Sequence, residues 1–328
     1  MKPLLVTMGD AAGIGPEIIA SAARLGELPD AVVLGDLAVM RRAIAATGGG
    51  LSVAVIESPL DHAPPGTLRL CPVAGLPDGL AELPWGRIDA RAGAGAASCI
   101  EAAVRRVQAG EGSAIVTAPI HKEALSAAGL PWPGHTEMLQ SLANPAAPPP
   151  VRMMLANPEL RVVLVTIHMS LRAAIDALDF DAVLSTLRIA HRSARAWGQD
   201  HPRIAVAGLN PHAGEGGLFG DEEIRFIAPA VEAARAEGID AQGPFPPDTV
   251  FMRARRGAFD LVVAMTHDHG LIPVKYMGVE EGVNVTLGLP FVRTSPDHGT
   301  AFDIAGTGRA DPASLVAALR MARRLSHI

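Results

Sequence analysis

Short apolar runs alternate along the chain with longer segments that have helical spacing. Residues 4–7 precede a helical segment at 16–25, and residues 31–34 precede another at 37–46. Alternation of strand-like and Ala-rich helical segments indicates βα units and a largely parallel sheet. The sequence therefore predicts an α/β fold. Further predicted strands cover residues 114–117 and 204–207, and further predicted helices cover 92–109, 183–197 and 221–237.

Three histidines each follow an apolar run that has the character of a strand. His168 follows residues 161–167, His212 follows 204–211, and His267 follows 261–266. Ligands of open α/β sheets bind outside the carboxyl ends of the strands, so three strand ends could bring three imidazoles together. Three neutral imidazoles suit a divalent metal that keeps a position open for substrate. A single histidine at a strand end is more often a hydrogen-bonded structural residue, but the equivalent positions of all three favour a shared metal site.

Composition and charge narrow the class of protein. The 328 residues are 49% hydrophobic and 19% charged, which indicates a folded protein that is long enough for two domains. A net charge of −6 argues against a nucleic-acid-binding surface. No apolar run is long enough for a bilayer span, the N-terminus does not read as a signal peptide, and Cys71 and Cys99 are too few for a disulfide framework. We expect a cytoplasmic protein without nucleic-acid or membrane partners.

Two segments offer polar groups to an anion. His135 and Thr136 precede a helical pattern that starts at Met138, and a hydroxyl and backbone N–H groups at a helix N-terminus suit an anion. An ordinary N-cap at Thr136 is the simpler interpretation. Lys275, Asn284 and Arg293 are spaced along the apolar segment 272–295, where buried charges need partners such as a substrate phosphate. The alternative is that Lys275 and Arg293 reach the surface.

Two glycine-rich segments are candidate nucleotide sites. Residues 9–17 follow the first strand, but they lack both the Gly-x-Gly-x-x-Gly pattern and the Lys-Ser/Thr of a P-loop. They therefore do not predict a Rossmann domain. Residues 297–308 carry His298 and Asp303, which could face a ribose or adenine, although this segment could also be a purely structural loop.

Six motifs occur in order along the chain. With them the sequence resembles the 4-hydroxythreonine-4-phosphate dehydrogenase (PdxA) family, and the ordered set is specific although each motif is short. The motifs are Gly9-Asp-x-x-Gly-Ile-Gly-Pro-Glu17, Gly134-His-Thr-Glu137, Asn210-Pro-His-Ala-Gly-Glu215, His267-Asp-x-Gly270, Gly282-Val-Asn-Val-Thr-Leu-Gly-Leu-Pro290 and Arg293-Thr-Ser-x-Asp-His-Gly-Thr-Ala301.

The resemblance implies a fold of the isocitrate/isopropylmalate dehydrogenase type, with two α/β/α domains around a central cleft. Residues 1–130 and 293–328 would form a first domain on the cofactor side. Residues 131–292 would form a second domain with the metal and substrate residues and the dimer interface. A homodimer with its active site near the interface is expected.

The resemblance also implies roles for particular residues. The family's metal ligands correspond to His168, His212 and His267, a set that suits one Zn²⁺ per subunit, with Mg²⁺, Mn²⁺ and Co²⁺ as alternatives. The family's substrate contacts correspond to His135, Thr136, Lys275, Asn284 and Arg293.

The proton acceptor and the cofactor are the remaining parts of the expected site. Asp248 and Lys275 are both candidate general bases, and motif position does not decide between them. His298 and Asp303 lie in the loop that corresponds to the binding stretch for the adenosine half of NAD or NADP in the wider superfamily.

The reaction that the resemblance implies is oxidation of 4-hydroxy-L-threonine 4-phosphate at C3, followed by decarboxylation to 3-amino-2-oxopropyl phosphate for pyridoxal phosphate biosynthesis. Three departures from the family pattern bear on the substrate: Ala11 replaces Pro, His269 replaces Gln, and Ile and Met-Ser flank His168. Paralogous 4-phospho-threonate or 4-phospho-erythronate dehydrogenases are therefore an alternative. A metal-dependent hydrolase, a phosphate acyltransferase of related fold and a non-catalytic sugar-phosphate-binding protein are alternatives from other classes.

Overall fold

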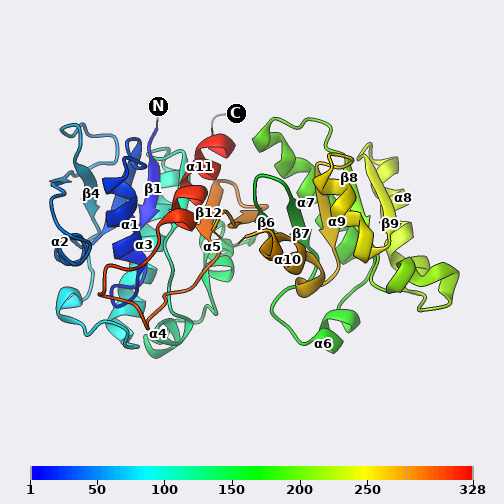
Figure 1. Cartoon of the computed structure of the whole chain (residues 1–328), viewed down its shortest axis with the longest axis horizontal. Coiled ribbons are helices and arrows are strands. Elements are labelled where there is room, and N and C mark those ends of the chain that lie inside the picture. The colour runs from blue at the N-terminus through cyan, green and yellow to red at the C-terminus, as the bar shows by residue number, and fades with distance from the viewer. Residues whose placement is uncertain (1, 279, 327–328) are drawn as a thin grey trace. The chain divides into compact units, whose positions relative to one another are not determined.

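The structure is a computed structural model that describes residues 2–278 and 280–326 of the chain (Figure 1). The chain divides into two compact units. Unit 1 contains the residues up to Pro150 together with Leu289–Ser326, and unit 2 contains Val151–Gly288. Unit 1 is therefore built from both ends of the chain.

The boundaries between the units differ from the predicted ones. Residues 131–150 and 289–292 were predicted in the second domain, and they belong to unit 1. The reason is hydrophobic packing, because Met138 and Leu139 are buried in the core of unit 1 and Phe291 packs against that core.

Unit 1 is a parallel sheet with helices packed on it. Its strand order is β3-β4-β2-β1-β5-β12, and the described pairs are all parallel. The strands are β1 (Leu4–Thr7), β2 (Ala31–Gly35), β3 (Val53–Val55), β4 (Leu68–Pro72), β5 (Ala114–Thr117) and β12 (Val292–Pro296). The α-helices are α1 (Gly15–Arg24), α2 (Leu37–Ala46), α3 (Ala90–Gln108), α4 (Lys122–Ala127), α5 (His135–Ala143) and α11 (Ala313–Ser326).

The central strands of unit 1 are apolar because both faces of the sheet are covered. All residues of β1, β2 and β5 are buried, which is typical of parallel strands under helices. Ile100 and Val104 of α3 pack with Leu5 and Ile115 of the sheet. The backbone pairing of β1 with β5 and of β5 with β12 aligns the carboxyl ends of these strands.

Unit 2 is a mixed sheet with the order β11-β6-β7-β10-β8-β9. The pairs β11–β6 and β6–β7 are antiparallel, and β7–β10, β10–β8 and β8–β9 are parallel. Its strands are β6 (Arg152–Ala156), β7 (Arg161–Leu164), β8 (Ile204–Ala207), β9 (Ala241–Phe245), β10 (Leu261–Ala264) and β11 (Val283–Leu287). Its α-helices are α6 (Leu171–Asp176), α7 (Phe180–Ala194), α8 (Ala228–Ala236), α9 (Pro247–Arg255) and α10 (His267–Tyr276).

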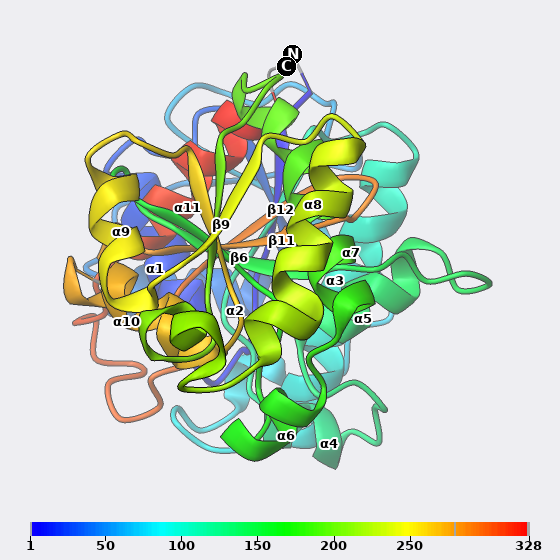
Figure 2. The same cartoon turned by 90° about the vertical axis from the view of Figure 1, so that its right-hand side faces the viewer.

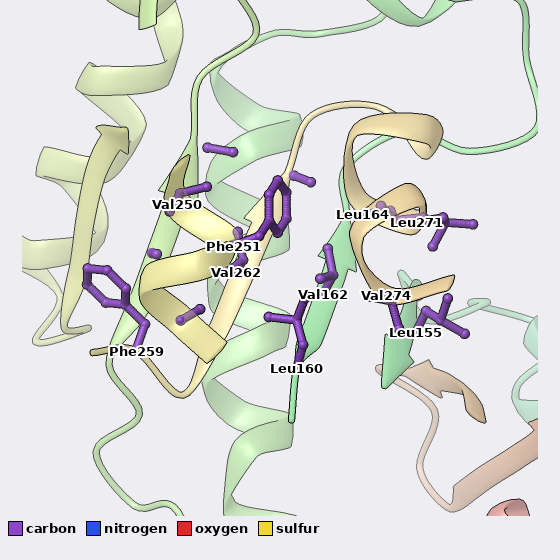
Figure 3. Packing of buried hydrophobic residues seen from close by; sticks show 14 of the residues in the cluster. Leu155, Leu160, Val162, Leu164, Val250, Phe251, Phe259, Val262, Leu271 and Val274 are labelled. Carbon is purple, nitrogen blue, oxygen red and sulfur yellow. The ribbon is translucent and has the colours of Figure 1, made fainter. Parts of the chain in front are cut away.

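Helices cover both faces of the unit 2 sheet. In Figure 2, α9 and α10 lie on one side of the strands, and α7 and α8 lie on the other. Phe251 of α9 and Leu271 of α10 pack with Val162 and Val262 of the sheet (Figure 3). The approach of α10 is close at Gly270, where an added Cβ would lie 2.4 Å from Leu164 Cδ2. The sheet core therefore sets the position of α10.

The predicted order of elements is confirmed, with two local differences. The helix that follows Gly134 begins at His135 rather than after a Thr136 cap, and no side chain caps it. The segment predicted as one helix over 221–237 begins with a π-helical turn, Glu223–Ile227, before α8. In the described part of the chain, none of the helices combines the length and apolar character that a bilayer span requires.

Candidate functional site

The three strand-end histidines lie at one edge of the unit 2 sheet. Strands β7, β10 and β8 are parallel neighbours, so their carboxyl ends share that edge. His168 and His212 lie in the segments after β7 and β8, and His267 begins the helix that follows β10. The rings of His168 and His267 lie with their centroids 5.6 Å apart. The structure thus brings two of the three predicted ligands together.

His267 has the environment of a metal-binding imidazole. It is the first residue of α10, and its Nδ1 lies 2.8 Å from Asp268 Oδ1. A carboxylate that accepts from one ring nitrogen orients the imidazole and leaves the other nitrogen for a ligand. This arrangement is consistent with an orienting role of Asp268 toward His267.

Two hollows adjoin the histidines. One has a volume of about 520 Å³ and is lined by residues 166–171, Ala174 and residues 266–269. The other, of about 680 Å³, is lined by His212 and Asp248 among others. Asp268 and His269 line both hollows. All of these residues belong to unit 2.

Two of the three histidines have a backbone conformation that is rare for residues with a side chain. The φ angles of His168 and His212 are 44° and 54°. Such a conformation costs on the order of 1–3 kcal/mol per residue and is concentrated at functional sites. The strain therefore supports a role for these two positions beyond packing.

The described residues contain no ready-made metal centre. Within residues 2–278 and 280–326, no three His, Cys, Asp or Glu side chains are placed as a group that could hold a metal ion. His212 lines the neighbouring hollow, and its ring centroid lies 6.1 Å from that of Phe219. The donor chemistry fits a divalent metal, and the third imidazole would come from His212 in the adjoining hollow, which shares Asp268 and His269 with the hollow of the other two.

The anion-binding candidates of unit 1 lie around a buried arginine. Arg293, on β12, is 2% exposed, and burial lowers its pKa to about 9. Its Nη2 and Nε donate to Thr117 Oγ1 at 2.6 and 3.2 Å. Burial, and then the charge of Arg293, hold the pKa of His135 well below its usual value. His135 is therefore neutral at neutral pH, and its buried Nε2 has no partner among the described residues.

The other predicted substrate residues have varied surroundings. Thr136 is half-buried in the first turn of α5. Lys275 of α10 and Asp248 of α9 are exposed, so Lys275 reaches the surface while Arg293 does not. Asn284, on β11, has a buried Oδ1 that accepts no hydrogen bond from the described residues. Such an atom is available to a ligand.

The predicted cofactor loop belongs to unit 1 and is tied down by a buried carboxylate. His298 and Asp303 are exposed, and His298 Nδ1 lies 2.9 Å from the carbonyl oxygen of its neighbour. Glu17 accepts hydrogen bonds from the backbone N–H groups of Gly306 and Gly308. Burial raises the pKa of Glu17.

Sequence reasoning did not single out Glu17, Thr117 or Glu223 as functional residues. All three are buried polar residues whose partners are distant in the sequence. Glu17 lies in the motif at residues 9–17, Thr117 at the end of a predicted strand, and Glu223 in a predicted helix. None of these positions indicates a partner far away in the chain.

The sequence is similar to known proteins along almost its whole length. A family model described as pyridoxal phosphate biosynthetic protein PdxA matches residues 27–322. The 4-hydroxythreonine-4-phosphate dehydrogenase of Beijerinckia indica subsp. indica is 57% identical over 334 residues, which cover 98% of this chain and 95% of that protein. The D-threonate 4-phosphate dehydrogenase of Pectobacterium atrosepticum is 47% identical over 329 residues, 99% of each chain.

A solved structure gives the same result for the fold. The crystal structure of 4-hydroxythreonine-4-phosphate dehydrogenase from Klebsiella pneumoniae has a TM-score of 0.91 and 45% sequence identity. The match covers 100% of this chain and 98% of that one. The predicted α/β fold is thereby confirmed.

Proposed function

Since the chain belongs to the PdxA family of pyridoxal phosphate biosynthetic proteins, we propose that it is an NAD(P)-linked dehydrogenase of 4-hydroxy-L-threonine 4-phosphate. The enzyme would oxidise the C3 alcohol, and the resulting β-keto acid would lose CO₂ to give 3-amino-2-oxopropyl phosphate. The observation that carries this proposal is the 57% identity, over 98% of the chain, to a protein of that name.

The second candidate substrate is D-threonate 4-phosphate. It is favoured by the 47% identity, over 99% of each chain, to a dehydrogenase named for it. The two substrates differ at C2, where one carries an amine and the other a hydroxyl group. The distinction therefore depends on the side chains that face C2.

A turnover assay tests the proposal. Purified protein with Zn²⁺ and either NAD⁺ or NADP⁺ is given each substrate, and reduced nicotinamide is followed by absorbance. We expect the higher kcat/KM with 4-hydroxythreonine 4-phosphate. A higher value with D-threonate 4-phosphate would replace the first substrate by the second. Product formation without cofactor reduction would indicate a hydrolase instead.

The anionic groups of the substrate need cationic and polar contacts. We assign these contacts to the residues that correspond to the family's substrate contacts, which are His135, Thr136, Lys275, Asn284 and Arg293. Arg293 can bind a phosphate or carboxylate with two N–H groups, and its burial strengthens such a contact. Neutral His135 and the unpartnered Asn284 Oδ1 suit hydroxyl or amine groups.

His168, His212 and His267 would hold a divalent metal. Three observations support this assignment. The ring centroids of His168 and His267 lie 5.6 Å apart, and the carboxylate of Asp268 lies beside Nδ1 of His267. His168 and His212 also have strained, positive φ angles. When bound, the ion supplies a Lewis acid that stabilises negative charge on the substrate oxygen in oxidation and decarboxylation. Asp248, which lines the hollow of His212, and Lys275 are the candidate proton acceptors.

Nicotinamide binding and dimer formation complete the proposal. The loop with His298 and Asp303 would bind the adenosine half of NAD or NADP. A homodimer is supported by exposed apolar side chains of unit 2, among them Met252 (47%), Ile272 (63%) and Tyr276 (90%), which all line the hollow of His212. Light scattering on the purified protein would measure the expected dimer mass, and a monomer would rule out this role for the surface.

A further inference from the structure

The loop that carries His212 has an unusual backbone. Residues 212–216 all have positive φ, with values of 54°, 53°, 80°, 42° and 66°. Three of the five carry side chains: His212, Ala213 and Glu215. Each such residue costs on the order of 1–3 kcal/mol unless its surroundings hold it in place. The loop therefore needs contacts from outside itself.

One buried carboxylate supplies those contacts. Glu223 is 3% exposed. Its Oε1 accepts from the backbone N–H groups of Leu209 and Asn210 at 2.7 and 2.8 Å. Its Oε2 accepts from Asn210 Nδ2 at 3.0 Å. Both oxygens therefore hold Leu209 and Asn210, which lie one residue before the strained run.

Gly208, before the strained run, and Gly214, within it, leave room for the same carboxylate. A Cβ at Gly208 would lie 2.9 Å from Glu223 Oε1, and a Cβ at Gly214 would lie 2.8 Å from Oε2. Glu223 itself begins the π-helical turn, and Phe226 and Ile227 of that turn are buried. The turn thus anchors Glu223 in the unit 2 core while its carboxylate contacts the loop.

We propose that Glu223 is a positioning residue that holds His212 ready for metal binding, an inference that rests on the proposed role of His212 as a ligand. A carboxylate suits this place because it only accepts hydrogen bonds, and it meets three donors. The side-chain amide of a glutamine at this position would instead direct its own N–H donor at another donor, the Nδ2 of Asn210. Glu223 acts through the loop and touches neither substrate nor metal in this role.

The test is the affinity for Zn²⁺ alone, measured by competition with a chromophoric chelator. We expect Glu223→Gln to bind Zn²⁺ at least about 10-fold more weakly, the scale seen when groups that orient metal ligands are removed. Glu17→Gln is the matched control, because Glu17 is also buried and also accepts two backbone N–H groups, but in unit 1. Its Zn²⁺ affinity should equal that of the wild type.

A double-mutant cycle separates this role from a general structural one. In a His212→Ala background, Glu223→Gln should cause no further loss of Zn²⁺ affinity, because the ligand that it positions is gone. Additive losses, or wild-type affinity in Glu223→Gln, would overturn the inference. Wild-type affinity in His212→Ala would instead overturn the metal assignment in the proposed function.

Asn210→Ala keeps the inference testable if Glu223→Gln does not fold. This change removes the Nδ2 donor, which also donates to Glu222 Oε2 at 2.7 Å, and leaves both backbone N–H contacts to Glu223 in place. A several-fold loss of Zn²⁺ affinity is expected. An unchanged affinity in a folded Asn210→Ala protein would overturn the proposed action of Glu223 on the loop.

Discussion

Thr117→Val should destabilise the protein by about 2 kcal/mol, because it removes an acceptor for a buried guanidinium. Thr117 is fully buried on β5, and its hydroxyl accepts from two nitrogens of Arg293. A hydrogen bond to a charged group contributes about 1.5–3 kcal/mol, and valine has nearly the same shape as threonine. The expected result is a melting temperature lower by a few degrees, together with a higher KM, since Arg293 is assigned to the anionic substrate.

The neighbouring strand offers a matched control. Thr7 lies beside Thr117 in the sheet register and is equally buried, but its hydroxyl has no hydrogen-bond partner among the described residues. Thr7→Val should therefore be neutral or stabilising. The comparison uses urea unfolding and differential scanning fluorimetry on both variants. Equal losses for the two would refute the reasoning, because they would show that Thr117 contributes packing and not a hydrogen bond to Arg293.

Three other predictions follow from buried groups. Glu17→Gln should weaken NAD(P) binding in calorimetry, because Glu17 holds the proposed cofactor loop at Gly306 and Gly308; unchanged affinity would contradict the assignment. Gly270→Ala should cost about 1–3 kcal/mol in urea unfolding, because its Cβ meets Leu164, and a variant as stable as the wild type would mean that α10 can move. Burial lowers the pKa of His135 in the folded state. As the pH falls, the unfolded state therefore protonates this imidazole before the folded state does, and the free energy of unfolding should decrease below about pH 6.5. His135→Gln should remove that part of the pH dependence.

Local patterns predicted most of the elements because each is specified within its own segment. The runs that become β1, β5 and β8 were bounded correctly, since β-branched residues and flanking turns delimit them. The sequence did not predict which strands pair in antiparallel orientation. The antiparallel pairs of β6 with β7 and β11 depend on long-range pairing, which the period of apolar residues does not encode.

The sequence predicted which site residues lie close together only where they directly follow a predicted strand. His168 and His267 follow parallel neighbouring strands, so topology alone brings them close. The position of His212 depends on a run of residues with left-handed backbone and on Glu223. The spacing of apolar residues along the sequence predicts neither of them. Contacts between residues far apart in the chain, such as Thr117 with Arg293, likewise emerge only from the folded sheet.

The discontinuity of unit 1 has a consequence for the order of folding during synthesis. Unit 2 is continuous over residues 151–288, whereas β12 and α11 join unit 1 only after unit 2 has been made. Until then β5 is an unpaired sheet edge, since β12 is its partner, and such edges invite aggregation. The contact between Thr117 and Arg293 therefore forms among the last, so a nascent chain can hold a folded unit 2 before Arg293, the arginine proposed to bind the substrate anion, is in place in unit 1.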